Sequence, residues 1–130
     1  MIKYLFKYLF IFGLFWANNG FSKELSDILA NKIANKIYLI EGGPNTKYPY
    51  GIKSIKTNGN INKSRQICVQ SIKNNYIRWQ KSGKKYSFIS FLGSRYAPVG
   101  VTNDPNNLNS NWVKNLNKMV DSETKKMFNR

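Results

Sequence analysis

Residues 25–50, LSDILANKIANKIYLIEGGPNTKYPY, decide the fold of this chain. Apolar side chains recur in this segment at the spacing that forms one stripe along a helix. The stripe consists of Leu25, Ile28, Leu29, Ile33, Ile37 and Ile40. Glu41 takes the next position in it, and two glycines and a proline follow at 42–44, where a helix ends. The sequence predicts a helix over residues 23–41 whose last turn directs a carboxyl group toward the core.

Two influences at that position favour the protonated form of Glu41. Partial burial disfavours a charged carboxylate, and the carboxyl end of a helix carries a partial negative charge. A general acid needs a proton held near neutral pH, so Glu41 is a candidate catalytic acid. The alternative is a helix-ending glutamate that bends out to solvent or pairs with a lysine.

The same periodicity predicts helices over residues 62–81, over 88–96 and beyond Asn109, with one more turn within 121–130. Ser22 or Ser26 is expected to cap the first helix, and Ser87 the third. The side chains expected to face inward are Ile61, Cys68, Val69, Ile72, Tyr76, Trp79, Phe88, Phe91, Leu92, Trp112, Val113, Leu116, Met119, Val120, Met127 and Phe128. The domain is therefore expected to be mainly α.

Residues 42–60 have no helical period and are rich in glycine, proline, asparagine and tyrosine. Asn58-Gly59 favours a primed turn, so this segment is expected to be a long loop or a short hairpin.

A chain of 130 residues has room for one domain. Residues 1–22 resemble a secretory signal, with Lys3 and Lys7 before a ten-residue apolar run and a small-x-small site at its end. A retained anchor is the alternative. The sequence predicts a domain over residues 23–130 that is secreted or periplasmic, with the membrane contacted only through the signal or anchor segment.

The predicted domain is strongly basic. Two of the 21 lysines and arginines precede residue 23, which leaves 19 basic and 6 acidic residues and a net charge of +13. Such a charge favours an anionic partner. The positive residues are mostly lysines spread along the chain, whereas base reading prefers arginine, so a nucleic-acid partner is not expected.

The chain has no histidine and a single cysteine, Cys68. These counts exclude histidine-based triads, ordinary zinc sites and an internal disulfide. Cys68 lies in an apolar helical segment and is expected to be a small core residue. Chemistry here must come from carboxylates, hydroxyls and amides, and no metal or cofactor is predicted.

Four segments in order carry a family resemblance: Glu41-Gly42-Gly43, residues 48–54 (YPYGIKS), residues 91–100 (FLGSRYAPVG) and residues 109–115 (NSNWVKN). Together they resemble small phage and bacterial lysozyme-like proteins related to the soluble lytic transglycosylases. The resemblance implies an α+β lysozyme-like fold in which the loop or hairpin forms a cleft. It also implies that Glu41 is the sole catalytic acid.

The resemblance further places residues 51–54 in the cleft and Tyr96-Ala97 near a pair that positions the acid and the sugar. Gly42, Lys53, Ser54 and Ala97 depart from the family pattern. The predicted substrate-binding residues are Tyr48, Tyr50, Ser54 and Tyr96, with Trp112 as a further ring that could line the cleft. Arg95 is a further candidate, for contact with a peptide-stem carboxylate. The alternatives are core packing for each aromatic residue, a turn hydroxyl for Ser54 and, for Arg95, a surface charge, which is favoured.

The expected reaction is cleavage of the β-1,4 bond between N-acetylmuramic acid and N-acetylglucosamine in peptidoglycan, by a monomer, with a 1,6-anhydro product. A single acid suffices for it, and only Asp104 among the other acids of the domain could reach the cleft. One alternative is a non-catalytic wall-binding or secretion-accessory module of the same fold. Another is a cationic protein that acts on membranes or on exported nucleic acid.

Overall fold

The structure, a computed structural model, describes residues 22–54, 56–99 and 109–130. These ranges contain the α-helices α2 (Asp27–Ile40), α3 (Ile61–Lys81), α4 (Phe88–Tyr96), α5 (Ser110–Met119) and α6 (Ser122–Phe128), and the 3-10 helices η1 (Gly43–Asn45) and η2 (Pro49–Gly51). The mainly helical class is confirmed. The described residues contain no strand, so the hairpin alternative for 42–60 is wrong; η1, η2 and a turn at residues 56–59 take its place.

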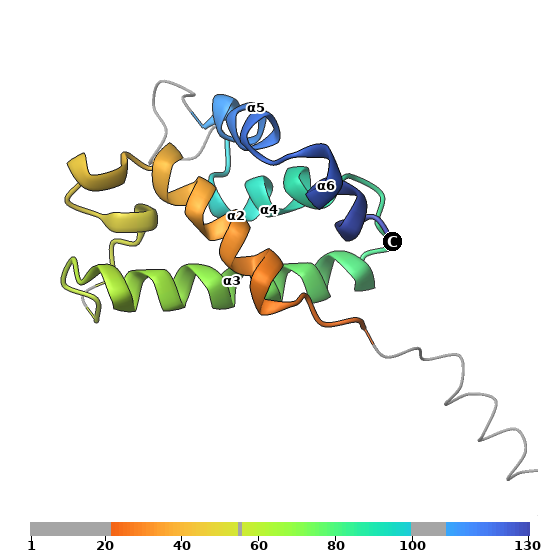
Figure 1. Cartoon of the computed structure of the whole chain (residues 1–130), viewed down its shortest axis with the longest axis horizontal. Helices are drawn as coiled ribbons and strands as arrows, with labels where there is room; N and C mark the ends of the chain where they lie inside the picture. The colour runs from red at the N-terminus through yellow and green to blue at the C-terminus, as the bar shows by residue number, and fades with distance from the viewer. Residues whose placement is uncertain (1–21, 55, 100–108) are drawn as a thin grey trace, which may run out of the picture.

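Helix α2 crosses in front of α3 and packs against both α3 and α5 (Figure 1). It begins at residue 27 rather than 23, because the side chain of Ser26 accepts the backbone N–H of Leu29 and caps it. Its buried side chains are Ala30, Ile33, Ala34 and Ile37. The alanines carry only a methyl group, which lets neighbouring helices approach closely.

The predicted stripe is wrong at Ile28, which is 72% exposed. Ile28 lies about 200° around the helix from Ala30, at the helical repeat of about 100° per residue, and the alanine side faces the core. Glu41 stays in register with the buried Ile37 and is half-buried. The inward position predicted for the carboxyl group is therefore confirmed.

Helix α3 is the long base of the fold, and its N-terminus is capped by Asn60, whose side chain accepts the N–H of Lys63. Its buried face is Ser64, Cys68, Ile72, Asn75, Tyr76 and Trp79. Ile61 was expected inside but is 46% exposed. It is the first residue of α3, whose first turn extends beyond the point where α2 crosses (Figure 1).

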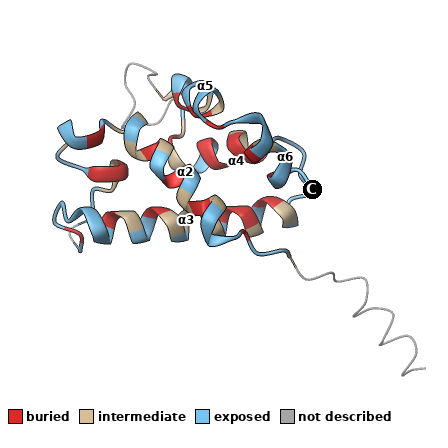
Figure 2. Cartoon of the chain, in the orientation of Figure 1, coloured by how far each residue is buried: buried red, intermediate tan, exposed pale blue. Residues whose placement is uncertain are grey.

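Helices α4, α5 and α6 close the core around Phe88. The ring of Phe88 lies 5.2 Å from Tyr76, 5.6 Å from Trp79 and 5.5 Å from Phe128, measured between ring centroids. Ser87 caps α4 as predicted. Buried turns of α2, α3 and α4 face one another across this core (Figure 2). Burial of each such large apolar side chain contributes about 1.5–3 kcal/mol to stability.

The inner face of α5 consists of Trp112 and Leu116, with Val120 after its end. Met119 and Met127 were expected inside but are 39% and 43% exposed. Each precedes a buried residue, Val120 or Phe128, by one position, which is about 100° around a helix. Asn109 precedes α5 as predicted, but its side-chain amide donates to the carbonyl oxygen of Pro98.

The contact between α4 and α5 requires a glycine. A Cβ atom built on Gly93 would lie 2.2 Å from Cγ2 of Val113 and 3.3 Å from Cε3 of Trp112. Gly93 thus lets α5 approach α4 closely enough to place Trp112 near the end of α2.

No helix in the described part of the chain is long and apolar enough to cross a bilayer. The predicted signal segment, apart from Ser22, lies outside the described residues, and so does Asp104.

Candidate active site

Glu41 ends α2, and its backbone N–H donates to the carbonyl oxygen of Ile37 over 2.9 Å. The helical hydrogen-bond pattern therefore extends to the glutamate itself. This fixes the direction of its side chain, which follows the buried face of the helix toward α5.

Trp112 holds the carboxylate. Its indole Nε1 donates a hydrogen bond of 2.9 Å to Oε1 of Glu41, and the tryptophan is 5% exposed. An intramolecular hydrogen bond contributes about 0.5–1.5 kcal/mol net to stability. Glu41 thus turns inward to a neutral donor rather than outward to a lysine.

The backbone of Gly51 lies against the other side of the carboxyl group. A Cβ atom at this glycine would lie 2.8 Å from Oε2 and 2.9 Å from Cδ of Glu41. Gly51 also has a left-handed φ of 70°. Only glycine fits both the conformation and the close approach.

Tyr96 links these parts. Its ring stacks on Trp112, with centroids 5.3 Å apart and planes 26° from parallel. Its hydroxyl donates to the carbonyl oxygen of Tyr50 and also lies 3.6 Å from Sγ of Cys68. Burial raises the pKa of the Tyr96 hydroxyl, so it remains a protonated donor at neutral pH.

Tyr50 was predicted to bind substrate, but its ring is only 3% exposed. It packs 5.1 Å from the ring of Tyr38, and its hydroxyl accepts a hydrogen bond from Arg65. The structure favours the packing alternative for Tyr50, whose backbone precedes Gly51 beneath the carboxylate.

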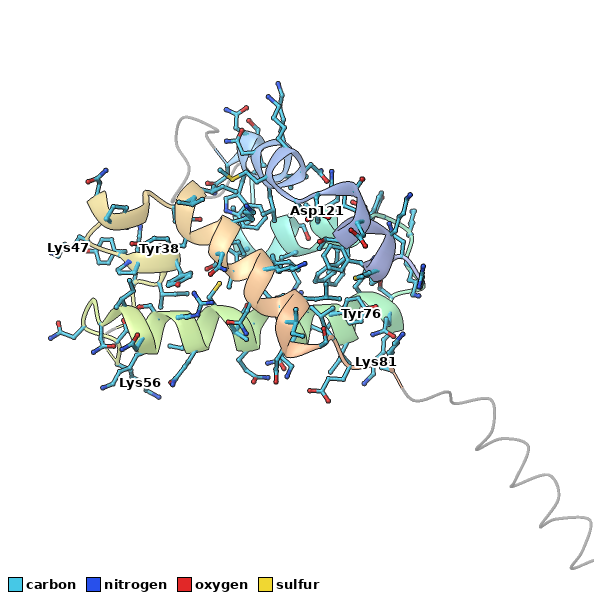
Figure 3. All side chains as sticks on the ribbon, viewed as in Figure 1. Tyr38, Lys47, Lys56, Tyr76, Lys81 and Asp121 are labelled. Carbon is cyan, nitrogen blue, oxygen red and sulfur yellow. The ribbon has the colours of Figure 1, made fainter. Side chains whose placement is uncertain are left out.

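The other two predicted binding residues lie on exposed parts of the loop. Tyr48 is 38% exposed, and the ammonium groups of Lys47 and Lys53 each lie 5.7 Å from the centroid of its ring. Figure 3 shows Tyr38 and Lys47 at the end of the molecule that η1 and η2 form. Tyr48 is thus an exposed aromatic ring with two ammonium groups near it.

Ser54 was predicted to bind substrate, with a turn hydroxyl as the alternative, and its hydrogen bonds are those of a turn hydroxyl. Its Oγ accepts the N–H of Lys56 over 3.2 Å, and its carbonyl oxygen accepts both the N–H and the hydroxyl of Thr57. These bonds shape the turn that leads into α3.

Cys68 is fully buried, and burial raises its pKa to about 11. The thiol is therefore protonated at neutral pH, which agrees with the predicted role as a core residue. Arg95 is exposed, as its surface-charge alternative expects.

The sequence analysis missed the role of Arg65. This half-buried guanidinium donates to Asn31 and Asn35 of α2 and to Tyr50. One sequence signal for this contact was available. Asn31 and Asn35 lie one turn apart on the first helix, so they form a polar row beside its apolar face.

Five surface hollows are lined by described residues, and Glu41 lines none of these five. Within the same part of the chain, no group of three or more acidic or cysteine side chains could hold a metal ion. The cleft predicted beside Glu41 stays a prediction.

Comparisons with protein-family models, with curated proteins and with solved structures found no match to this chain. The family resemblance and the roles that it implies therefore stay expectations.

Proposed function

We propose that this protein is an exported enzyme that cleaves peptidoglycan glycan strands, with Glu41 as its single catalytic acid and base. The observation that supports the proposal is the position of one carboxyl group. Trp112 donates a hydrogen bond to the carboxyl group of Glu41, and the backbone of Gly51 packs against it. A glutamate that serves only to end a helix needs neither contact. Preorganised geometry of this kind is what proton transfer to a bound substrate requires.

The proposed reaction needs no metal, no cofactor and no second carboxylate. Glu41 gives its proton to the glycosidic oxygen between N-acetylmuramic acid and N-acetylglucosamine as the bond from that oxygen to C1 breaks. The 2-acetamido group assists at C1. The 6-hydroxyl of the same sugar then attacks C1, and its proton passes to the Glu41 carboxylate. The acid is restored, and the product is a 1,6-anhydro sugar.

Three of the other acids of the domain, Glu24, Asp27 and Asp121, are engaged in structural contacts away from Glu41. Glu24 and Asp27 both pair with Lys73, at 3.0 Å and 2.8 Å, at the opposite end of α2 from Glu41. Asp121 caps α6 by accepting from the backbone and hydroxyl of Thr124. These carboxylates have structural partners, whereas most glycosidases flank the scissile bond with two acids.

The charge of the domain fits the same substrate. A net charge of +13 over residues 23–130 favours association with an anionic wall polymer. Tyr48 adds an exposed ring with two ammonium groups within 5.7 Å of its centroid, a combination that suits a sugar that carries a carboxylate.

A second candidate function is a non-catalytic wall-binding or secretion-accessory module. The hydrogen bonds of Ser54 within its turn favour this function, because the catalytic hypothesis assigns Ser54 to substrate binding. In that reading the Glu41–Trp112 bond serves only to fasten α2 to α5.

The test compares wild type, Glu41→Gln and Glu123→Gln on purified sacculi. Glu123 is an exposed glutamate of α6 and provides the matched control. Release of soluble fragments by wild type and Glu123→Gln, but not by Glu41→Gln, supports the proposal. Equal cosedimentation of all three without release supports the binding module. Leakage of anionic vesicles that survives Glu41→Gln supports a cationic membrane-active protein.

A further inference from the structure

The guanidinium group of Arg65 joins three elements of the fold. Its Nη1 donates to Oδ1 of Asn35 over 2.8 Å and to the hydroxyl of Tyr50 over 2.9 Å. Its Nη2 donates to Oδ1 of Asn31 over 2.8 Å. Arg65 lies on α3, the asparagines on α2 and Tyr50 on η2, so one side chain fixes the loop to both helices.

The chemistry of these bonds requires an arginine. All three acceptors are neutral oxygens, and they receive N–H groups from both terminal nitrogens of the guanidinium. The planar fork of arginine offers donors in fixed directions, whereas a lysine ammonium cannot span the same acceptors. The half-buried group thus acts as a rigid bracket.

The bracket holds a strained residue. Tyr50 has φ 59° and ψ 16°, a left-handed conformation that costs a non-glycine residue about 1–2 kcal/mol. Such a conformation persists where its surroundings over-determine it. Tyr50 is fixed at both ends, because Arg65 binds its hydroxyl and Tyr96 binds its carbonyl oxygen.

The next residue along the chain is Gly51, which lies against the carboxyl group of Glu41. The opposite side of that carboxyl group is held by Trp112, and Trp112 stacks on Tyr96. The position of the carboxyl group therefore depends on a connected set of contacts that runs from Gly51 and Tyr50 through Tyr96 to Trp112. Arg65 fixes the loop residue in this set, Tyr50.

We propose that Arg65 is a positioning residue, which acts through Tyr50 to hold Gly51 beneath Glu41 and so sets the direction of the catalytic carboxyl group. The inference rests on the proposed function for its effect on turnover. Its structural half, the dependence of the Glu41–Trp112 bond on Arg65, is measurable without any substrate.

The test uses Arg65→Lys, which keeps the charge, and Tyr50→Phe, which removes one hydroxyl and keeps the ring against Tyr38. Arg78→Lys is the matched control, since Arg78 is an exposed arginine of the same helix. Tyr50→Phe also protects the test against misfolding, because it deletes a single atom.

The first readout is the indole N–H resonance of Trp112 in the NMR spectrum of the purified chain, with Glu41→Gln as the reference for a changed carboxyl partner. We expect Arg65→Lys and Tyr50→Phe to shift it toward the Glu41→Gln position and Arg78→Lys to leave it in place. An unmoved resonance in both variants overturns the proposal.

The second readout is turnover on soluble glycan strands. Misplacement of a catalytic group lowers kcat, so we expect a loss of about tenfold or more in both variants, with KM changed less than about twofold. The double variant should lose no more than the worse single variant, because both act on one bond. Wild-type kcat in both variants overturns the proposal. If the wild type itself is inactive, the proposed function fails, and the NMR resonance still decides the role of Arg65.

Discussion

The indole N–H of Trp112 meets the carboxylate of Glu41 at 2.9 Å, across 71 residues of sequence. This bond connects the last turn of α2 to the first turn of α5, and the close α4–α5 contact at Gly93 makes it possible. The carboxyl group at the centre of the proposed site is thus positioned by tertiary packing as well as by its own helix.

Trp112→Phe removes the donor but keeps an aromatic ring for the stack on Tyr96. We expect stability to fall by about 0.5–1.5 kcal/mol, the net contribution of an intramolecular hydrogen bond, as measured by urea unfolding. We also expect kcat on glycan strands to fall by about tenfold or more, because the acid loses its orientation.

The control is Trp79→Phe, which removes a similar indole donor that binds the carbonyl oxygen of Tyr86 at 2.7 Å, away from Glu41. It should lose stability and keep its turnover per folded molecule. Equal turnover in the two variants would refute a role for the Trp112 donor.

Gly51→Ala should displace the acid. The new methyl group would lie within 2.8 Å of Oε2 of Glu41, so the carboxyl group must move or the loop must open. We expect turnover to fall by about tenfold or more for either response. Gly83→Ala is the control, since Gly83 has a similar left-handed φ of 86° but open space around its Cβ position.

Both glycine variants should lose about 1 kcal/mol from backbone strain, by thermal or urea unfolding. Only Gly51→Ala should lose activity. If Gly83→Ala loses as much activity as Gly51→Ala, general strain rather than contact with the carboxylate explains the result.

Gly93→Ala tests the helix contact that brings Trp112 to Glu41. In an exposed helix this substitution would stabilise by about 1 kcal/mol. Here the methyl group would lie 2.2 Å from Cγ2 of Val113, so we expect a destabilisation of about 1–3 kcal/mol instead. Val113→Ala in the same chain removes the clashing atom and should restore part of the loss. An increase in stability on Gly93→Ala alone would contradict the described packing.

Cys68 predicts a pH dependence of stability. Burial raises the thiol pKa from 9.0 to about 11, so the folded state holds this proton more tightly than the unfolded state. The resulting stability is complete below pH 9 and is lost as the pH rises toward 11, at about 1.4 kcal/mol per pH unit.

Urea unfolding between pH 8 and 11 measures this slope. In Cys68→Ala the slope should be shallower, and the slope that remains should come mainly from Tyr96 and Tyr76, whose pKa values are also raised by burial. The folded wild type should react slowly with thiol reagents at pH 8 because the thiolate is scarce. An equal slope in Cys68→Ala would contradict the burial effect.

Periodicity predicted which face of each helix is buried, but not how far along the helix the core extends. The row from Ile33 through Ile37 to Glu41 was therefore placed correctly, as was the cap at Ser87. Ile61 is in register with the buried Ser64 and Cys68 and is nevertheless 46% exposed at the start of α3. The prediction for Ile28 was wrong for another reason. The buried face of α2 includes Ala30 and Ala34, and Ile28 lies on the other side of the helix.

The contacts that build the candidate site could not be predicted from spacing. Glu41 and Trp112 are 71 residues apart, and Arg65 is 34 residues from Asn31. Such pairs depend on how the helices pack. The residue type alone does not tell whether a polar side chain bonds to a partner inside the fold or faces solvent. The hydrogen bonds that Trp112 and Arg65 make were therefore not predicted.

Mass spectrometry of the soluble products released from sacculi tests whether Glu41 transfers the proton in glycan cleavage. We expect wild type to release muropeptides with anhydro ends, each lighter by one water than a hydrolysed fragment, and Glu41→Gln to release none. Hydrated ends from wild type would replace the transglycosylase by a hydrolase and keep the role of Glu41. The same products from Glu41→Gln as from wild type, or no products from wild type, would contradict this role of Glu41.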